Sequence, residues 1–131
     1  MITSAGIKVE GLHQVAARAD DLDSSIDFYR NVVGCDFLGK FDPPGLAFFD
    51  LAGTRLLLEK GASPATLYLR VDDIGAAFET LRGRGVTFLD EPHLIHRDEE
   101  GIFGNPGSEE WMVFFRDPSA NLLGLVSSRS I

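Results

Sequence analysis

Two arginines at equivalent places in the chain are the side chains best suited to bind a ligand. Arg18 and Arg70 lie 52 residues apart, each in the middle of a similar segment. A guanidinium presents several N–H donors in one plane and pairs with carboxylate or phosphate through two hydrogen bonds. The pair therefore predicts an anionic ligand, unless carboxylates of the chain itself, such as Glu59 or Asp50, meet the same need.

The segments around the two arginines form an internal repeat. One segment reads QVAARADDL from Gln14, and the other reads TLYLRVDDI from Thr66. The same spacing of 52 residues relates Asp21 to Asp73. A repeat of this kind predicts two similar structural units, and it lets each position be compared with its equivalent.

The first unit reads as a strand, a helix and three further strands. Alternating apolar residues predict a strand over 12–19. Asp20 or Asp21 is a suitable N-cap for the helix that follows, and Gly34 ends this helix. Turn-forming residues then separate three strands over 36–41, 46–51 and 55–59.

The second unit follows the same plan after a short linker at 61–64. A strand over 66–71 leads to a helix that begins at Asp72 or Asp73. The polar, glycine-rich segment 97–108 is the one long loop and a candidate mobile lid. Three strands complete the unit, over 86–90, 110–116 and 122–127.

The composition is that of a globular protein without a basic surface. The chain has 131 residues, is 44% hydrophobic and carries a net charge of −8. This balance makes nucleic acid an unsuitable partner. One cysteine, Cys35, excludes an intrachain disulfide, and no apolar run has the length of a membrane span. We expect one cytoplasmic domain over 1–131, with unit one at about 9–60 and unit two at about 65–128.

Five short motifs occur in order along the two units: Asp21-Leu22, Phe28-Tyr29, Val33-Gly34, Val71-Asp72-Asp73-Ile74 and Asp117-Pro-x-x-Asn121. Together these motifs resemble the vicinal oxygen chelate superfamily, which includes glyoxalase I, methylmalonyl-CoA epimerase, extradiol dioxygenases and bleomycin-resistance proteins. The resemblance covers roughly residues 11 to 128. It implies an α+β fold of two tandem βαβββ units whose sheets curl into an open cup around the ligand site.

Enzymes of this superfamily hold a divalent metal with four side chains, one from the first and one from the last strand of each unit. The metal polarises two neighbouring substrate oxygens. The resemblance places Gln14 and Thr66 at the first-strand positions, and Glu59 and Gly124 at the last-strand positions. This set contains no imidazole or thiolate and is a weak one for zinc or nickel. We therefore expect either a divalent metal held by Gln14 and Glu59, or a cup without metal.

Three histidines are alternative metal ligands. His13 is adjacent to Gln14, and adjacent strand residues point to opposite faces, so only one of the two faces the cup unless a bulge intervenes. His93 and His96 point to opposite faces if their segment is extended, but a turn would change this. Together with Glu59 they form a second metal hypothesis; otherwise they pack under the loop or face solvent.

Strand alternation extends the inward-facing set implied by the resemblance. Arg18, Arg55, Tyr68 and Arg70 fall on the same faces as the four ligand positions. Arg18, Arg70 and Thr66, with aromatic surface from Trp111, are therefore candidates to bind the substrate. Tyr68 is a candidate donor to a developing oxyanion beside Glu59.

These residues support three functional hypotheses. The first is a glyoxalase-like or epimerase-like lyase or isomerase, in which Glu59 removes a proton next to a carbonyl or helps to hold a metal. The second is a binding protein that sequesters a small anionic molecule, as bleomycin-resistance proteins do. The third is an extradiol dioxygenase, which needs two histidines and one glutamate on iron. The resemblance also implies a homodimer.

Overall fold

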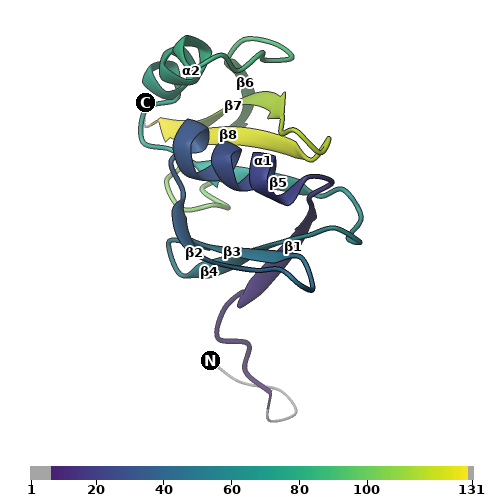
Figure 1. Cartoon of the computed structure of the whole chain (residues 1–131). Coiled ribbons are helices and arrows are strands. Elements are labelled where there is room, and N and C mark those ends of the chain that lie inside the picture. Colours follow the sequence, from purple (N-terminus) through teal and green to yellow (C-terminus); the bar gives the residue numbers. More distant parts are fainter. Residues whose placement is uncertain (1–6, 130–131) are drawn as a thin grey trace.

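Alternating buried and exposed residues build two four-stranded sheets in the computed structural model, which describes residues 7–129 (Figure 1). The first sheet has the order β1-β4-β3-β2, and the second has the order β5-β8-β7-β6. In each sheet the first strand of the unit pairs in parallel with the last strand, and the other pairs are antiparallel. The strands are β1 (Gln14–Arg18), β2 (Asp36–Phe41), β3 (Leu46–Leu51), β4 (Thr54–Glu59), β5 (Thr66–Arg70), β6 (His93–Asp98), β7 (Ser108–Arg116) and β8 (Leu122–Arg129).

Aspartate caps begin both helices. The Asp21 carboxylate accepts the Ser24 N–H (3.1 Å) at the start of α1 (Leu22–Asp27), which continues as the π-helical segment η1 (Phe28–Val33). The equivalent Asp73 caps α2 (Ile74–Gly83), so the second cap is Asp73 rather than Asp72. Gly34 ends the first helix with φ of +91°, a conformation that glycine adopts readily. The α+β class and the two βαβββ units are thus confirmed.

No helix within residues 7–129 is long and apolar enough to cross a membrane.

The strand expected over 86–90 is wrong. Phe88 makes only an isolated bridge with Phe115, and the second strand of this unit is β6 instead. Phe88 packs between Phe78 and Phe115 in the core, which explains the apolar pattern. The Asp90 side chain, rather than a backbone carbonyl, accepts the Phe114 N–H (3.2 Å), and Pro92 lacks an N–H to continue a ladder.

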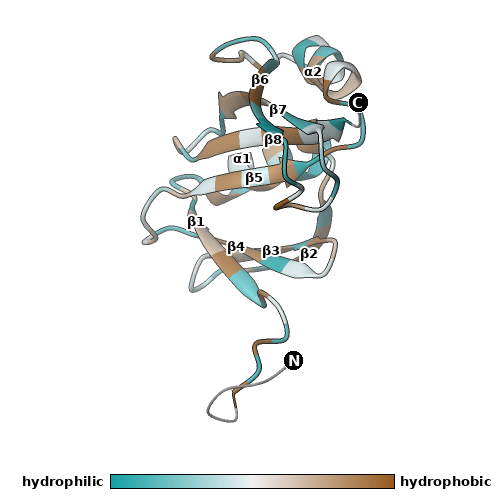
Figure 2. Ribbon diagram, turned by 180° about the vertical axis from the view of Figure 1, so that it is seen from behind, coloured by the Kyte–Doolittle hydropathy of each residue, from teal (hydrophilic) through white to brown (hydrophobic). Residues whose placement is uncertain are grey.

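One hydrophobic core joins the two units. It gathers the buried faces of both sheets, α1, η1 and α2, and Phe28 of the first unit packs against Phe115 of the second. The hydropathy colouring of Figure 2 shows apolar residues recurring along β5, β7 and β8. Each sheet therefore turns one face to the core and leaves the other face open.

Polar contacts from the turn 117–121 also connect the units. The Asn121 side chain donates to the Arg18 carbonyl (2.7 Å) and accepts the Arg18 and Ala65 N–H groups (3.2 and 2.7 Å). The Ser119 hydroxyl accepts the Asp20 N–H at 2.8 Å. The turn thus fixes the end of β1 and the start of β5 at the same place.

The long loop between β6 and β7 spans 99–107 and is held by one carboxylate. The buried Asp98 side chain accepts the N–H groups of Ile102 and Phe103 at 2.8 and 2.9 Å. These hydrogen bonds lower the pKa of the Asp98 carboxyl. The tip of the loop carries two strongly exposed apolar side chains, Ile102 and Phe103.

Candidate functional site

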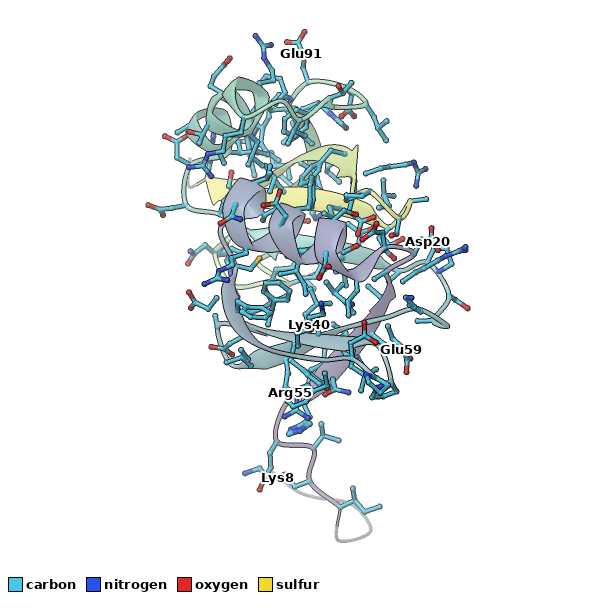
Figure 3. The ribbon with its side chains drawn as sticks, viewed as in Figure 1. Lys8, Asp20, Lys40, Arg55, Glu59 and Glu91 are labelled. Carbon is cyan, nitrogen blue, oxygen red and sulfur yellow. The ribbon has the colours of Figure 1, made fainter. Side chains whose placement is uncertain are left out.

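The open face of the first sheet carries the first-unit residues that the sequence placed in the cup. Figure 3 shows Arg55 on the side of this sheet away from α1, whereas Lys40 lies on the side of α1. The Lys40 ammonium binds Asp23 at 2.7 Å, which agrees with this placement. Gln14, Ala16 and Arg18 of β1, and Arg55, Leu57 and Glu59 of β4, alternate with core-facing neighbours.

The parallel register of β1 and β4 separates Gln14 from Glu59. Gln14 lies opposite Arg55, and Glu59 lies opposite Arg18 at the other end of the strand. Gln14 and Glu59 are thus four residues out of register, or roughly 13 Å along the strands. The Gln14 side-chain oxygen instead accepts a hydrogen bond from Arg55 Nε at 2.7 Å. The structure therefore brings Gln14 together with Arg55.

The repeat identifies the true equivalent of Gly124. In the second unit Gly124 lies opposite Tyr68, two residues beyond Thr66. The corresponding place in the first unit, two residues beyond Gln14, is opposite Ala16 and holds Leu57. The last-strand position in the first unit is therefore Leu57, and Glu59 is the equivalent of Val126.

An aromatic pair fills the space beside Gly124. A Cβ atom at this position would lie 2.7 Å from a ring carbon of Phe114 and 3.3 Å from one of Tyr68. The two rings meet edge to face with centroids 6.0 Å apart. Glycine is needed here for the close approach of the two rings. Because glycine has no side chain, position 124 supplies no atom that could coordinate a metal.

The residues at the four equivalent positions do not fit a divalent metal. They supply the Gln14 oxygen, which Arg55 already engages, and the Thr66 hydroxyl, while Leu57 and Gly124 supply none. Within residues 7–129 no group of three or more His, Cys, Asp or Glu side chains is arranged to hold a metal ion.

The histidines are also dispersed. His13 precedes β1, and its Nε2 lies 3.5 Å from Arg55 Nη2, so both His13 and Gln14 reach the same guanidinium. His93 and His96 pair with Met112 and Glu110, which share one face of β7. Opposite faces were expected only for a regular extended segment, and this condition is not met because the register of β6 shifts between Leu94 and His96.

Two candidate binding residues have other contacts. Arg18 Nε donates to the Asp20 carboxylate at 2.6 Å, so its charge is already paired. Trp111 packs on the core side of β7, where its indole N–H donates to Glu109 (3.1 Å) and Arg129 stacks on its ring. It therefore lies on the face opposite Phe114.

A cavity of about 840 Å³ between the units brings together Thr66, Tyr68 and Arg70. It runs along the edge strand β5 and is lined mainly by apolar side chains from both units. Burial, followed by the charge of Asp36, raises the pKa of the lining thiol of Cys35 to about 11. Glu59 lines a separate cavity of about 360 Å³ at the end of β4.

Sequence reasoning missed one wall of the larger cavity. It is lined by Ala77 and Leu81 of α2, which share one helical face at i, i+4 spacing, and by the C-cap residue Arg84. That spacing was visible in the sequence, but it also describes a core-facing helix. Arg84 is anchored across the units, because Nη1 donates to the Val32 carbonyl at 2.8 Å.

Solved structures of low sequence identity share this fold. A member of the glyoxalase/bleomycin resistance protein/dioxygenase superfamily from Sphaerobacter thermophilus is 25% identical, with a TM-score of 0.71 over 91% of this chain and 98% of the other. A lactoylglutathione lyase from Agrobacterium tumefaciens is 21% identical, with a TM-score of 0.69 over 91% and 94%. A third, from Alicyclobacillus acidocaldarius, is 23% identical, with a TM-score of 0.65 over 90% and 91%.

The sequence itself matches one family over most of its length. The matched residues are 11–125, which include the first βαβββ unit, the turn at 117–121 and the second unit as far as the first half of β8. With the repeat, the parallel pairing of first and last strands and the shared fold, this match is sufficient for assignment. The chain belongs to the Glyoxalase/Bleomycin resistance protein/Dioxygenase superfamily.

Proposed function

We propose that the protein binds a small anionic organic molecule in the cavity between its two units. The observation that carries this proposal is that Thr66, Tyr68 and Arg70, three of the residues expected to contact ligand, line the same cavity. Pockets for small molecules commonly combine apolar walls with a few polar groups that fix the ligand. This cavity has that character.

Arg70 is the residue proposed to hold the anion. It is exposed on β5, and no salt bridge within residues 7–129 involves its guanidinium. A carboxylate of the ligand would pair with it through two hydrogen bonds. The hydroxyls of Thr66 and Tyr68, on the same face of β5 as Arg70, would add further donors.

Sequestration is favoured over enolate chemistry by the position of Glu59. A lyase or isomerase mechanism with Glu59 as base and Tyr68 as oxyanion donor requires both side chains at one substrate. The two residues line different cavities. A dioxygenase would need clustered histidines, and no such cluster is present within the described residues. A binding role resembling that of the bleomycin-resistance branch requires neither.

The experiment is a ligand screen read by NMR on the full chain. Small carboxylates and phosphates with apolar bodies are titrated into the protein, and the shifts of the β5 amides are followed. Arg70→Gln should weaken binding by about tenfold or more, because a bidentate ion pair is lost. Arg82→Gln removes the same charge from the outer surface of α2 and should change the affinity less than twofold. Equal loss in both variants, or no response of β5 to any anion, would reject the proposal.

The same samples distinguish binding from catalysis. The spectrum of each bound ligand is recorded over time, since sequestration predicts an unchanged ligand. Conversion that is abolished by Glu59→Gln would instead establish the enzymatic alternative.

We also propose that the protein is a homodimer. Three apolar side chains before β1 are largely exposed in the single chain, with 74% for Ile7, 83% for Val9 and 63% for Leu12. A partner copy would cover such a segment. Light scattering on the eluting protein tests this directly, and a mass of 14.3 kDa at micromolar concentration would refute it.

A further inference from the structure

The guanidinium of Arg55 is held in one orientation on the open face of the first sheet. Nε donates to the Gln14 oxygen at 2.7 Å, and the guanidinium lies over the Phe48 ring at 5.2 Å from its centroid. His13 Nε2 lies 3.5 Å from Nη2. Three contacts, two from the start of β1 and one from β3, therefore fix a side chain that is exposed to solvent.

None of these contacts supplies a negative charge. Among residues 7–129 no salt bridge involves Arg55, whereas Arg18, Lys40 and Arg97 all pair with carboxylates. Asp50 lies opposite Arg55 on β3, but its carboxylate accepts the Gly53 N–H at 3.0 Å. Arg55 is therefore an oriented cation without a carboxylate partner among residues 7–129. Preorganisation of this kind favours an external anion, because little side-chain entropy is lost on binding.

Arg55 engages one of the expected metal ligands. Gln14 occupies a position that members of the family use to hold a metal, and here its oxygen is bound to Arg55. Leu57 and Gly124 offer no donor. The positive charge that a divalent ion would supply next to Gln14 is thus supplied by the protein itself.

The surroundings of Arg55 restrict the class of ligand. Because Nε is bound to Gln14 and His13 Nε2 lies 3.5 Å from Nη2, the N–H groups of Nη1 and the second N–H of Nη2 remain to face a planar anion end-on. Phe48 and Phe41 form an edge-to-face pair with centroids 5.8 Å apart, and Phe41 is 55% exposed. A flat apolar group attached to the anion would lie against these rings.

From these contacts we infer that the open face of the first sheet is a second binding site, separate from the Arg70 cavity, in which Arg55 takes the place of the family's metal and binds an aromatic carboxylate directly. The ligand is held by two N–H donors and by aromatic contact with Phe41 and Phe48. Binding needs no divalent ion.

Benzoate is the probe for this site. The full chain, treated with a chelator, is titrated with benzoate, and the ¹H–¹⁵N resonance of Arg55 Nε is followed. We expect a saturable shift that is unchanged when zinc or manganese is added back, and a much weaker response to benzyl alcohol, which lacks the charge. No shift with benzoate, an equal shift with benzyl alcohol, or binding only in the presence of metal would each overturn the inference.

Variants separate Arg55 from a general charge effect. Binding to the variants is read from the backbone amide shifts of β1 and β4, because the Nε resonance is lost and a ligand-observed spectrum would also report benzoate in the Arg70 cavity. Arg55→Gln should weaken benzoate binding by about tenfold or more, and Arg55→Lys should weaken it severalfold, because lysine keeps the charge but loses the paired donors. Arg82→Gln is the matched control, since Arg82 also stacks on a phenylalanine at 5.2 Å, and it should bind as the wild type does.

Two further variants guard against misfolding and against confusion of the two sites. Phe48→Leu keeps the charge and should still weaken benzoate binding, so the inference does not depend on Arg55→Gln being folded. Arg70→Gln should leave the benzoate response of Arg55 unchanged. An unchanged affinity in both Arg55→Lys and Phe48→Leu would show that benzoate binds elsewhere.

Discussion

The Tyr29 hydroxyl donates a 2.7 Å hydrogen bond to the Asp117 carboxylate across the boundary between the two units. Asp117 also accepts the backbone N–H groups of Ser119 and Asn121 and the side-chain N–H of Asn121. Tyr29 is 1% exposed and Asp117 is 6% exposed, so these groups satisfy each other without solvent. Two motifs that identify the family are therefore in direct contact.

Replacing Tyr29 by Phe should destabilise the fold. The substitution removes a hydrogen-bond donor from one oxygen of the buried Asp117 carboxylate, which should lower the free energy of unfolding by about 1–3 kcal/mol. Chemical denaturation followed by circular dichroism measures the change. Tyr68→Phe is the control: Tyr68 is 59% exposed, and its loss should alter the free energy of unfolding by no more than about 0.5 kcal/mol. Equal effects would show that the buried hydrogen bond contributes nothing.

Stability should fall at alkaline pH, and Tyr29 should account for part of this fall. Burial, reinforced by the adjacent Asp117 carboxylate, holds the pKa of Tyr29 far above its ordinary value. The unfolded chain ionises near pH 10, at about the usual tyrosine pKa, while the native protein keeps the proton. The stabilisation is thus complete below about pH 10 and is lost as the pH rises further. The free energy of unfolding is measured by chemical denaturation at a series of pH values from about 8 upward. Above about pH 10 it should decrease more steeply with pH for the wild type than for Tyr29→Phe.

Cys35 should react slowly with alkylating reagents in the native state. Its pKa of about 11 leaves little thiolate at pH 8, on the order of one part in a thousand. The rate with iodoacetamide should rise with pH toward that value and should be far higher in urea at the same pH. A ligand in the larger cavity should slow the native reaction further, because Cys35 lines that cavity. Native and unfolded rates that agree would contradict the assignment of a buried thiol.

Gly124→Ala should destabilise the second sheet. The added Cβ would lie 2.7 Å from the Phe114 ring, and the resulting displacement is expected to cost about 1–3 kcal/mol. Phe114→Leu should recover part of the loss in the double variant, since the ring is then absent. A double-mutant cycle measured by thermal unfolding checks this coupling, and strictly additive effects would argue against the contact.

Asp98→Ala should release the loop over 99–107. The Ile102 and Phe103 amides lose their acceptor, so their hydrogen exchange should accelerate at neutral pH. Because the native pKa of Asp98 is lowered, the stabilisation is present above about pH 4 and disappears as the pH falls through the native value. Glu100→Ala removes a neighbouring carboxylate and should leave these amides protected.

Local signals in the sequence were sufficient for most of the fold. The helix ends depend only on nearby residues: Asp21 and Asp73 accept N–H groups three residues further along, and Gly34 adopts a left-handed conformation. These ends could therefore be predicted without tertiary information. The strand over 86–90 failed for the opposite reason. Val86 and Phe88 alternate with a polar residue, as in a strand. In the structure the backbone of Phe88 forms only an isolated bridge, and its ring packs against the core.

The site was harder to predict, because it depends on the register of parallel strands. A shift of two residues between β1 and β4 keeps every side chain on the same face, so alternation alone cannot distinguish Leu57 from Glu59. Arg55 faced the expected side, but its contact with Gln14 follows only from the register. The bulge in β6 is a similar case, because it moved His93 and His96 onto one face.

We expect the contacts of the Asn121 side chain to make the covalent connection at 61–64 largely dispensable. The Asn121 amide group forms hydrogen bonds with Arg18 at the end of β1 and with Ala65 just before β5. The hydrophobic core is also continuous across the boundary between the units. Two separately produced halves, cut within 61–64, should therefore find each other and reassemble in solution. In such a split protein, binding of a ligand or partner would be detected as a change in the affinity of the two halves for each other.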